Sequence, residues 1–136
     1  MSTNFARMFD GARAARNAGR RDEAERGYAD AGGQARIEND PLALAHAQRH
    51  ISDLARERGS VDEALSAAAE AVAIYRLQAG SRPLDLANAL RLNALALDAA
   101  DRREEATPLW QEARGLYASV GVAAGVDEAD ARLAAK

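Results

Sequence analysis

Residues 41–47 read Pro-Leu-Ala-Leu-Ala-His-Ala, and residues 83–89 read Pro-Leu-Asp-Leu-Ala-Asn-Ala. The two stretches lie 42 residues apart, and the same interval relates Tyr75 to Tyr117. A chain that matches itself at one fixed interval of this size is usually a stack of equal structural units. This internal repeat therefore decides the fold class.

Apolar residues recur every three or four positions through most of the chain, which is the spacing of an amphipathic helix. Leu84, Ala87 and Leu90 are one example. Residues that favour strands are few, and no alternating apolar run persists. We therefore expect seven helices, at about residues 3–18, 21–37, 41–58, 61–79, 83–100, 103–119 and 126–135, with a loop at residues 120–125.

The breaks between the expected helices are short and regular. Gly19 and Gly59 follow the ends of two helices, and acidic residues open the helices that come next. Pro41 and Pro83 begin helices, where a missing N–H does no harm. Links this short force neighbouring helices to run antiparallel. The sequence therefore predicts an all-α domain of about three helix pairs and a short terminal helix, with units at residues 3–37, 41–79 and 83–119.

Small residues keep a fixed distance from the turns of the three units. The turn positions are Gly19, Gly59 and Asp101. Seven residues before each turn position lies a small residue, and five and twelve residues after it lie alanines. A fourth shared position, nine residues after the turn, lies between the two alanines. In order, these four sets are Ala12, Ser52 and Ala94; Ala24, Ala64 and Ala106; Ala31, Ala71 and Ala113; and Tyr28, Ala68 and Trp110.

This pattern resembles the tetratricopeptide repeat, and it is most similar to the longer variant found in kinesin light chains, since the common form has about 34 residues. The resemblance implies a right-handed α-solenoid in which each helix pair covers the apolar face of the one before. The sequence departs from the family pattern in three ways. Gly27, Gly32 and Gly33 interrupt the second helix of the first unit, Asp101 replaces a turn glycine, and Ala68 replaces a bulky residue.

Composition and charge narrow the function classes. The chain has 136 residues, which suits one domain at residues 1–136, and its net charge is −3. An acidic balance argues against nucleic-acid binding. There is no apolar run long enough to span a membrane and no secretory signal in the first ten residues, so we expect a cytoplasmic protein. The chain has no cysteine, which excludes disulfides and thiolate chemistry.

The sequence offers no arrangement typical of catalysis. There is no glycine-rich phosphate loop, and no serine has a visible base. His46 and His50 share a helix face, with Asp53 three residues later, but Arg49 lies between them and no firm third ligand follows. We therefore expect a protein that is not an enzyme and that holds no metal and no cofactor.

The resemblance implies that the first helix of each pair lines a concave groove that holds the ligand. Arginines outnumber carboxylates at the corresponding positions, although the whole chain is acidic. Such a local reversal of charge favours a partner that carries carboxylates, whereas in the alternative interpretation these arginines are only solvated or paired with carboxylates such as Glu57. The expected groove residues are Phe9, Arg13, Arg16, Asn17, His46, Arg49, Asp53, Arg56, Asn88, Arg91, Leu95 and Asp98.

The function expected on this basis is that of an adaptor, which binds a peptide or protein segment in the groove and binds neither nucleic acid nor membrane. Two alternatives stay open. One is a self-associating structural module, including a homodimer formed through the apolar stripe of Phe5, Met8 and Phe9. The other is a ligand-sensing regulatory domain of a signalling or transcription system. The fold by itself does not decide among them.

Overall fold

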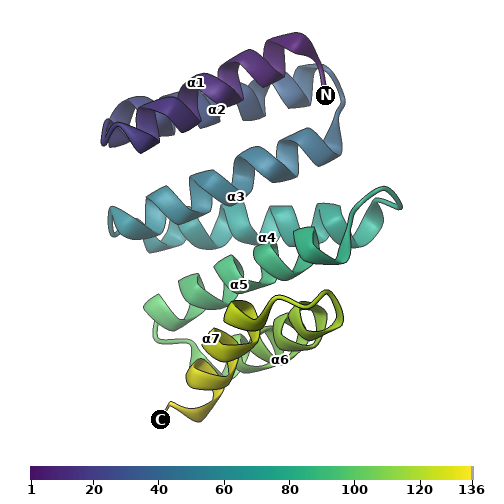
Figure 1. The fold of residues 1–136 in the computed structure, drawn as a ribbon. Coiled ribbons are helices and arrows are strands. Elements are labelled where there is room, and N and C mark those ends of the chain that lie inside the picture. Colours follow the sequence, from purple (N-terminus) through teal and green to yellow (C-terminus); the bar gives the residue numbers. More distant parts are fainter. Residues whose placement is uncertain (136) are drawn as a thin grey trace.

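A computed structural model describes residues 1–135 of the chain as a stack of seven helices, with no strand among those residues (Figure 1). The odd-numbered helices lie in front in Figure 1 and the even-numbered helices behind them. Each helix packs against its neighbours in the chain, so the helices form consecutive pairs of a helical-repeat solenoid. The helices are α1 (Thr3–Asn17), α2 (Arg21–Ile37), α3 (Pro41–Glu57), α4 (Val61–Leu77), α5 (Pro83–Ala99), α6 (Arg103–Ser119) and α7 (Ala123–Ala134).

One turn geometry joins five of the six helix junctions. In each, a single residue adopts a positive φ, and the next residue donates its N–H to the carbonyl five residues back, as Arg20 does to Ala15 at 2.9 Å. This pairing is the Schellman motif, which satisfies carbonyls that a helix end leaves without partners. A new helix then begins two residues after the positive-φ residue. The five positive-φ residues are Gly19, Asn39, Gly59, Asp101 and Gly121.

The junction between α4 and α5 differs from the other five. Its five-residue link, Gln78–Arg82, has no positive-φ residue, and the Ser81 hydroxyl donates to the carbonyls of Tyr75 at 2.7 Å and Gln78 at 2.8 Å. The turns at Gly19 and Gly59 are 40 residues apart, whereas those at Gly59 and Asp101 are 42 apart. The longer link accounts for the two extra residues of the second unit.

The last helix begins earlier than the sequence predicts. We expected a loop at residues 120–125, whereas α7 starts at Ala123, two residues after the turn at Gly121. Gly125 does not interrupt the helix, because a Cβ there would overlap the ring of Tyr117 and glycine lets α7 lie against it. The other six helices lie where predicted, within two residues at either end.

The small residues of the repeat pattern are the contact points of the core. None of the twelve residues at the four shared positions exposes more than 2% of its surface. Alanines at these places let two helices approach closely, and the one polar member is satisfied, since the Ser52 hydroxyl donates to the carbonyl of Ala64 at 2.8 Å. The spacing that predicted the fold is therefore also the spacing that packs it.

The glycines of α2 do not interrupt that helix, so this expectation was wrong. The helix is continuous from Arg21 to Ile37. A Cβ built on Gly27 would lie 2.7 Å from the Cβ of Ala12 and 3.1 Å from its Cα, which places the backbones of α1 and α2 in direct contact. Gly33 has nothing within 4 Å and faces solvent.

Helix α7 presents a polar outer face. Counted from the helix start, Asp127 and Asp130 occupy the positions of Ala87 and Leu90, which are fully buried in α5. Both aspartates are exposed. This face of α7 therefore does not continue the apolar core. No helix within residues 1–135 combines the length and apolar character that a membrane span requires.

Gly27→Ala and Gly33→Ala make a matched pair in one helix. We expect Gly27→Ala to lower the free energy of unfolding by about 1–3 kcal/mol, because the added methyl forces α1 and α2 apart. Gly33→Ala should raise it by about 0.5–1 kcal/mol, because alanine favours an exposed helical position. Urea unfolding followed by circular dichroism measures both. Equal effects would contradict the close contact at Ala12.

Candidate functional site

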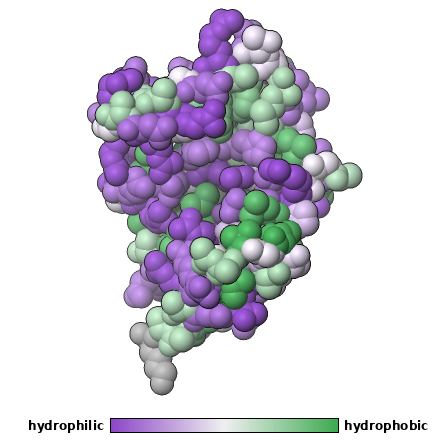
Figure 2. Space-filling view, in the orientation of Figure 1, coloured by the Kyte–Doolittle hydropathy of each residue, from purple (hydrophilic) through white to green (hydrophobic). Residues whose placement is uncertain are grey.

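The odd-numbered helices line a groove made of three adjoining hollows, of about 350, 160 and 350 Å³. Arg91 of α5 belongs to the wall of all three, so the hollows form one continuous surface from α1 to α7. Figure 2 shows this face of the stack as mostly hydrophilic. The groove residues are Arg16, Arg49, His50, Asp53, Arg56, Asn88, Arg91, Leu92, Leu95, Asp98, Ala99, Tyr117, Val122, Ala124, Gly125, Glu128 and Arg132.

Most of the expected groove residues do line these hollows, and four do not. Phe9 packs against Tyr28 and His50, and the His46 ring nitrogen Nδ1 is bonded to the Tyr75 hydroxyl at 2.6 Å. Arg13 is exposed and pairs with Asp10 of its own helix at 2.6 Å. Asn17, the last residue of α1, is exposed and lines none of the hollows. The expected residues that do line the groove are Arg16, Arg49, Asp53, Arg56, Asn88, Arg91, Leu95 and Asp98.

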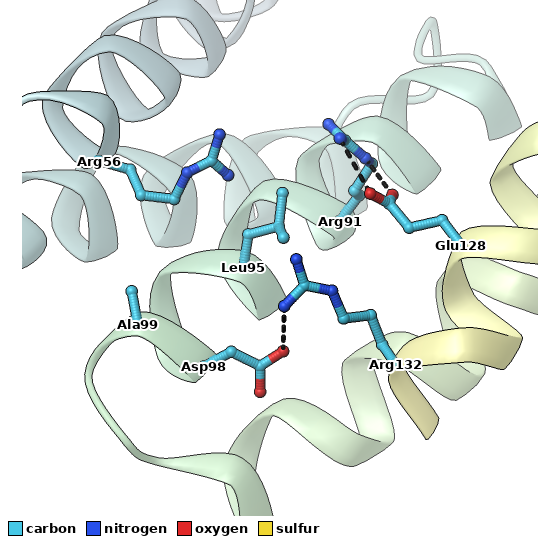
Figure 3. Close-up of a pocket in the computed structure, with 7 residues that line it drawn as sticks. All are labelled: Arg56, Arg91, Leu95, Asp98, Ala99, Glu128 and Arg132. Atoms are coloured by element: carbon cyan, nitrogen blue, oxygen red, sulfur yellow. Dashed lines mark hydrogen bonds and ion pairs between the residues drawn. The ribbon is translucent and has the colours of Figure 1, made fainter. Parts of the chain in front are cut away.

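Sequence reasoning missed the contribution of α7 to the groove. Glu128 and Arg132 reach into the first hollow from α7, facing Arg91 and Asp98 of α5 (Figure 3). The available signal was the turn at Gly121, which repeats the turns at the other junctions and gives α7 the phase of α1, α3 and α5. The predicted loop at residues 120–125 concealed it.

Each arginine that lines the groove has a carboxylate partner. At the α1–α3 end, Arg16 contacts Asp53 at 2.5 Å and Glu57 at 3.2 Å, while Arg56 contacts the second oxygen of Asp53 at 2.6 Å. Asp53 thus serves two guanidinium groups. In the middle, Arg49 lies 3.4 Å from Asp85, a carboxylate whose side chain is only 8% exposed.

The first hollow lies at the α5–α7 end and contains two more pairs. Arg91 donates two hydrogen bonds to the carboxylate of Glu128, and Arg132 lies 3.7 Å from Asp98 (Figure 3). Arg56 also points into this hollow, with no partner among the residues that line it (Figure 3). Five arginines and three carboxylates line the hollows, and Glu57 and Asp85 pair with two of these arginines without lining them. The predicted excess of arginine is therefore present in the lining but smaller than the sequence indicated.

Aromatic side chains from the outer helices hold the groove residues from beneath. Tyr117 of α6 donates to the Asn88 amide oxygen at 2.7 Å, and Trp110 of α6 donates its Nε1–H to Asp98 at 2.9 Å. Tyr75 of α4 makes the corresponding bond to His46. Burial raises the pKa of Tyr75 and of Tyr117, so both hydroxyls stay protonated. These bonds fix the orientation of polar side chains along the groove floor.

The aromatic of the first unit behaves differently. The Tyr28 ring stacks on His50, with centroids 4.5 Å apart and planes inclined by 5°. Its hydroxyl is buried and has no hydrogen-bond partner. Burial raises the pKa of Tyr28. Burial and the nearby charges of Arg49 and Arg16 together lower the pKa of His50 to about 4. His50 is therefore a neutral stacking partner at ordinary pH.

The histidine pair that the sequence raised as a metal-like arrangement is used in packing. His46 is bonded to Tyr75, and His50 lies on Tyr28. Among residues 1–135, no three His, Asp or Glu side chains are grouped so as to hold a metal ion.

Tyr28→Phe and Tyr117→Phe test the difference between the two hydroxyls. Tyr28→Phe removes a buried hydroxyl without a partner, so we expect the free energy of unfolding to stay equal or to rise. Tyr117→Phe removes a bond to Asn88 and should lower that free energy by about 1 kcal/mol. Chemical denaturation checks both. A clear loss of stability in Tyr28→Phe would mean that its hydroxyl does have a partner.

His50 should make stability depend on pH. The pKa of His50 in the folded protein is below the ordinary value of 6.5. Its contribution to the free energy of unfolding is therefore fully present above pH 6.5 and is lost as the pH falls toward 4. Between pH 7.5 and 5 we expect a loss of about 2 kcal/mol. His50→Phe should remove most of this loss, leaving a part due to His46, whose pKa burial also lowers. Denaturation at a series of pH values measures it, and an unchanged slope in the variant would contradict the assignment.

No protein-family model matches the sequence, and no curated protein matches it. Among solved structures, the crystal structure of BtubC (BKLC) from P. vanneervenii is similar, with a TM-score of 0.76 and 19% sequence identity. The similarity covers 86% of this chain and 48% of that chain, so the chain spans about half the length of BtubC. At this level of identity the likeness shows the fold alone, which is that of a helical-repeat protein.

Proposed function

We propose that the chain is a non-catalytic interaction module that binds a segment of another protein in its groove. The observation that carries the proposal is the continuous surface of three hollows, which is lined by five arginines and three carboxylates on a chain of net charge −3. Helical-repeat stacks use such extended concave surfaces for binding. The buried small residues at the repeat positions support a tetratricopeptide-type repeat, close to the longer kinesin-light-chain variant.

The excess of arginine favours a segment that carries carboxylates. Guanidinium groups bind carboxylates with two parallel hydrogen bonds, which makes arginine effective in such recognition. The groove arginines already have partners within the chain, so binding is an exchange of one carboxylate for another. A partner therefore gains most at arginines whose internal partner can be given up at low cost.

Arg56 and Arg91 meet that condition best. Arg56 shares Asp53 with Arg16, so its departure leaves Asp53 paired. Arg91 and Glu128 are both partly exposed, and solvent can take up the released carboxylate. Arg49 is less suited, because Asp85 is buried and would keep only Arg82, at 3.3 Å, as a charged partner when Arg49 left. Leu95 lies in the same hollow as Arg56 and Arg91 and offers an apolar contact.

The double variant Arg56→Gln with Arg91→Gln tests the proposal. Both substitutions remove charge and keep a polar side chain, so we expect the protein to stay folded and to lose the proteins that the native chain captures. The measurement is a pull-down from a lysate of the source cells, with the captured proteins identified by mass spectrometry and the melting temperature recorded for each variant.

Arg13→Gln with Arg114→Gln is the matched control. Each of these arginines carries one exposed ion pair, with Asp10 and with Asp130, and neither lines the groove. The control removes the same charge from the chain, so it should capture what the native chain captures. If the groove variant retained the same proteins as the control, the groove would not be the binding surface.

A further inference from the structure

Glu128 occupies a repeat position whose other members are held from beneath. It is the sixth residue of α7, as His46 is the sixth of α3 and Asn88 the sixth of α5. Tyrosines of the following outer helices bond His46 and Asn88. Within the described residues, Glu128 has no such bond from an outer helix. Its carboxylate instead contacts the guanidinium of Arg91 (Figure 3).

Arg91 is the most central donor of the groove, because it lines all three hollows. The carboxylate of Glu128 accepts hydrogen bonds from the Nε and from one terminal nitrogen of Arg91. A carboxylate of a bound segment would use the same two-bond geometry. These bonds also raise the pKa of Arg91. Because Glu128 belongs to this chain, it is present at every Arg91 at high effective concentration.

We propose that Glu128 is an internal competitor for Arg91 and that it sets the affinity of the groove for acidic segments. An incoming carboxylate binds Arg91 by displacing Glu128, while α7 keeps its place through its buried Ala129 and the contact of Gly125 with Tyr117. Glu128 thereby selects against weakly acidic segments, which cannot supply enough contacts to replace it. This inference rests on the proposed function, and it assigns to Glu128 the control of how tightly the groove binds.

Glu128→Gln tests the competitor directly, with fluorescently labelled hexaglutamate as the probe and anisotropy titration at low salt as the measurement. The variant keeps the shape of the side chain and removes its charge. We expect hexaglutamate to bind about threefold to tenfold more tightly than to the native chain, because Arg91 no longer has to leave a carboxylate.

Asp130→Asn is the matched control, since it removes one charge from the same helix but breaks only the exposed pair with Arg114 outside the groove. It should change the affinity for hexaglutamate by less than about twofold, because solvent and salt screen a charge that lies outside the groove. The double variant Arg91→Gln with Glu128→Gln should lose the gain in affinity, because the guanidinium that Glu128 covers in the native chain is then absent.

The outcomes separate the inference from the proposed function. If Glu128→Gln and Asp130→Asn tightened binding equally, the effect would come from net charge and the competitor would be refuted. If the native chain and both variants bound hexaglutamate with equal affinity, the chain would still bind acidic segments and only the competitor would be wrong. If neither the native chain nor Glu128→Gln bound it, the acidic partner itself would be wrong, and the inference would be overturned with it.

Discussion

The structure depends on helices that touch through methyl groups and glycine. Where Gly27 meets Ala12, only the methyl group of Ala12 lies at the contact between the two helices. Close approach of this kind brings the outer helices near enough for their long aromatic side chains to pass between the inner ones. Trp110 and Tyr117 of α6 can therefore reach Asp98 and Asn88 in the groove. The small residues of the core thus determine which polar groups the groove presents, although none of them lies in it.

The sequence predicted the fold closely because packing and turns share one period. Alanines at fixed distances from Gly19 and Gly59 predicted both the helices and their buried faces, and Asp101 adopts the positive φ of the glycine it replaces. The start of α7 was missed because valine and glycine around Gly121 look like a loop when read without the period. Gly27 was misread for a related reason, since a glycine that breaks a helix and one that admits a neighbouring helix have the same local sequence.

The groove could be predicted only in part. The repeat period placed Arg16, Arg49, Arg56 and Arg91 on the inner helices, and all four line the hollows. For Arg16, Arg49 and Arg91 it could not show which carboxylate they meet, because those partners lie in the next unit, 36 or 37 residues along the chain. Such pairs depend on the rotation between successive units, which is a property of the stack and is not visible in any local pattern. His50 was weighed as a metal ligand and set aside, and nothing in the sequence indicated that it is a neutral stacking partner of Tyr28.

Every junction between inner helices has at least one such long-range ion pair: Arg16 with Asp53, Arg49 with Asp85, and Arg91 with Glu128. The charges of the groove therefore also join neighbouring units of the stack. Their exposure differs along the stack, since Asp85 is 8% exposed and Glu128 is 31% exposed. A buried pair is costly to break, whereas a partly exposed one can exchange its partner with water or with another carboxylate. Exchange should therefore be easiest at the α5–α7 junction and hardest at the α3–α5 junction, so the same type of ion pair can maintain the stack at one place and admit a ligand at another.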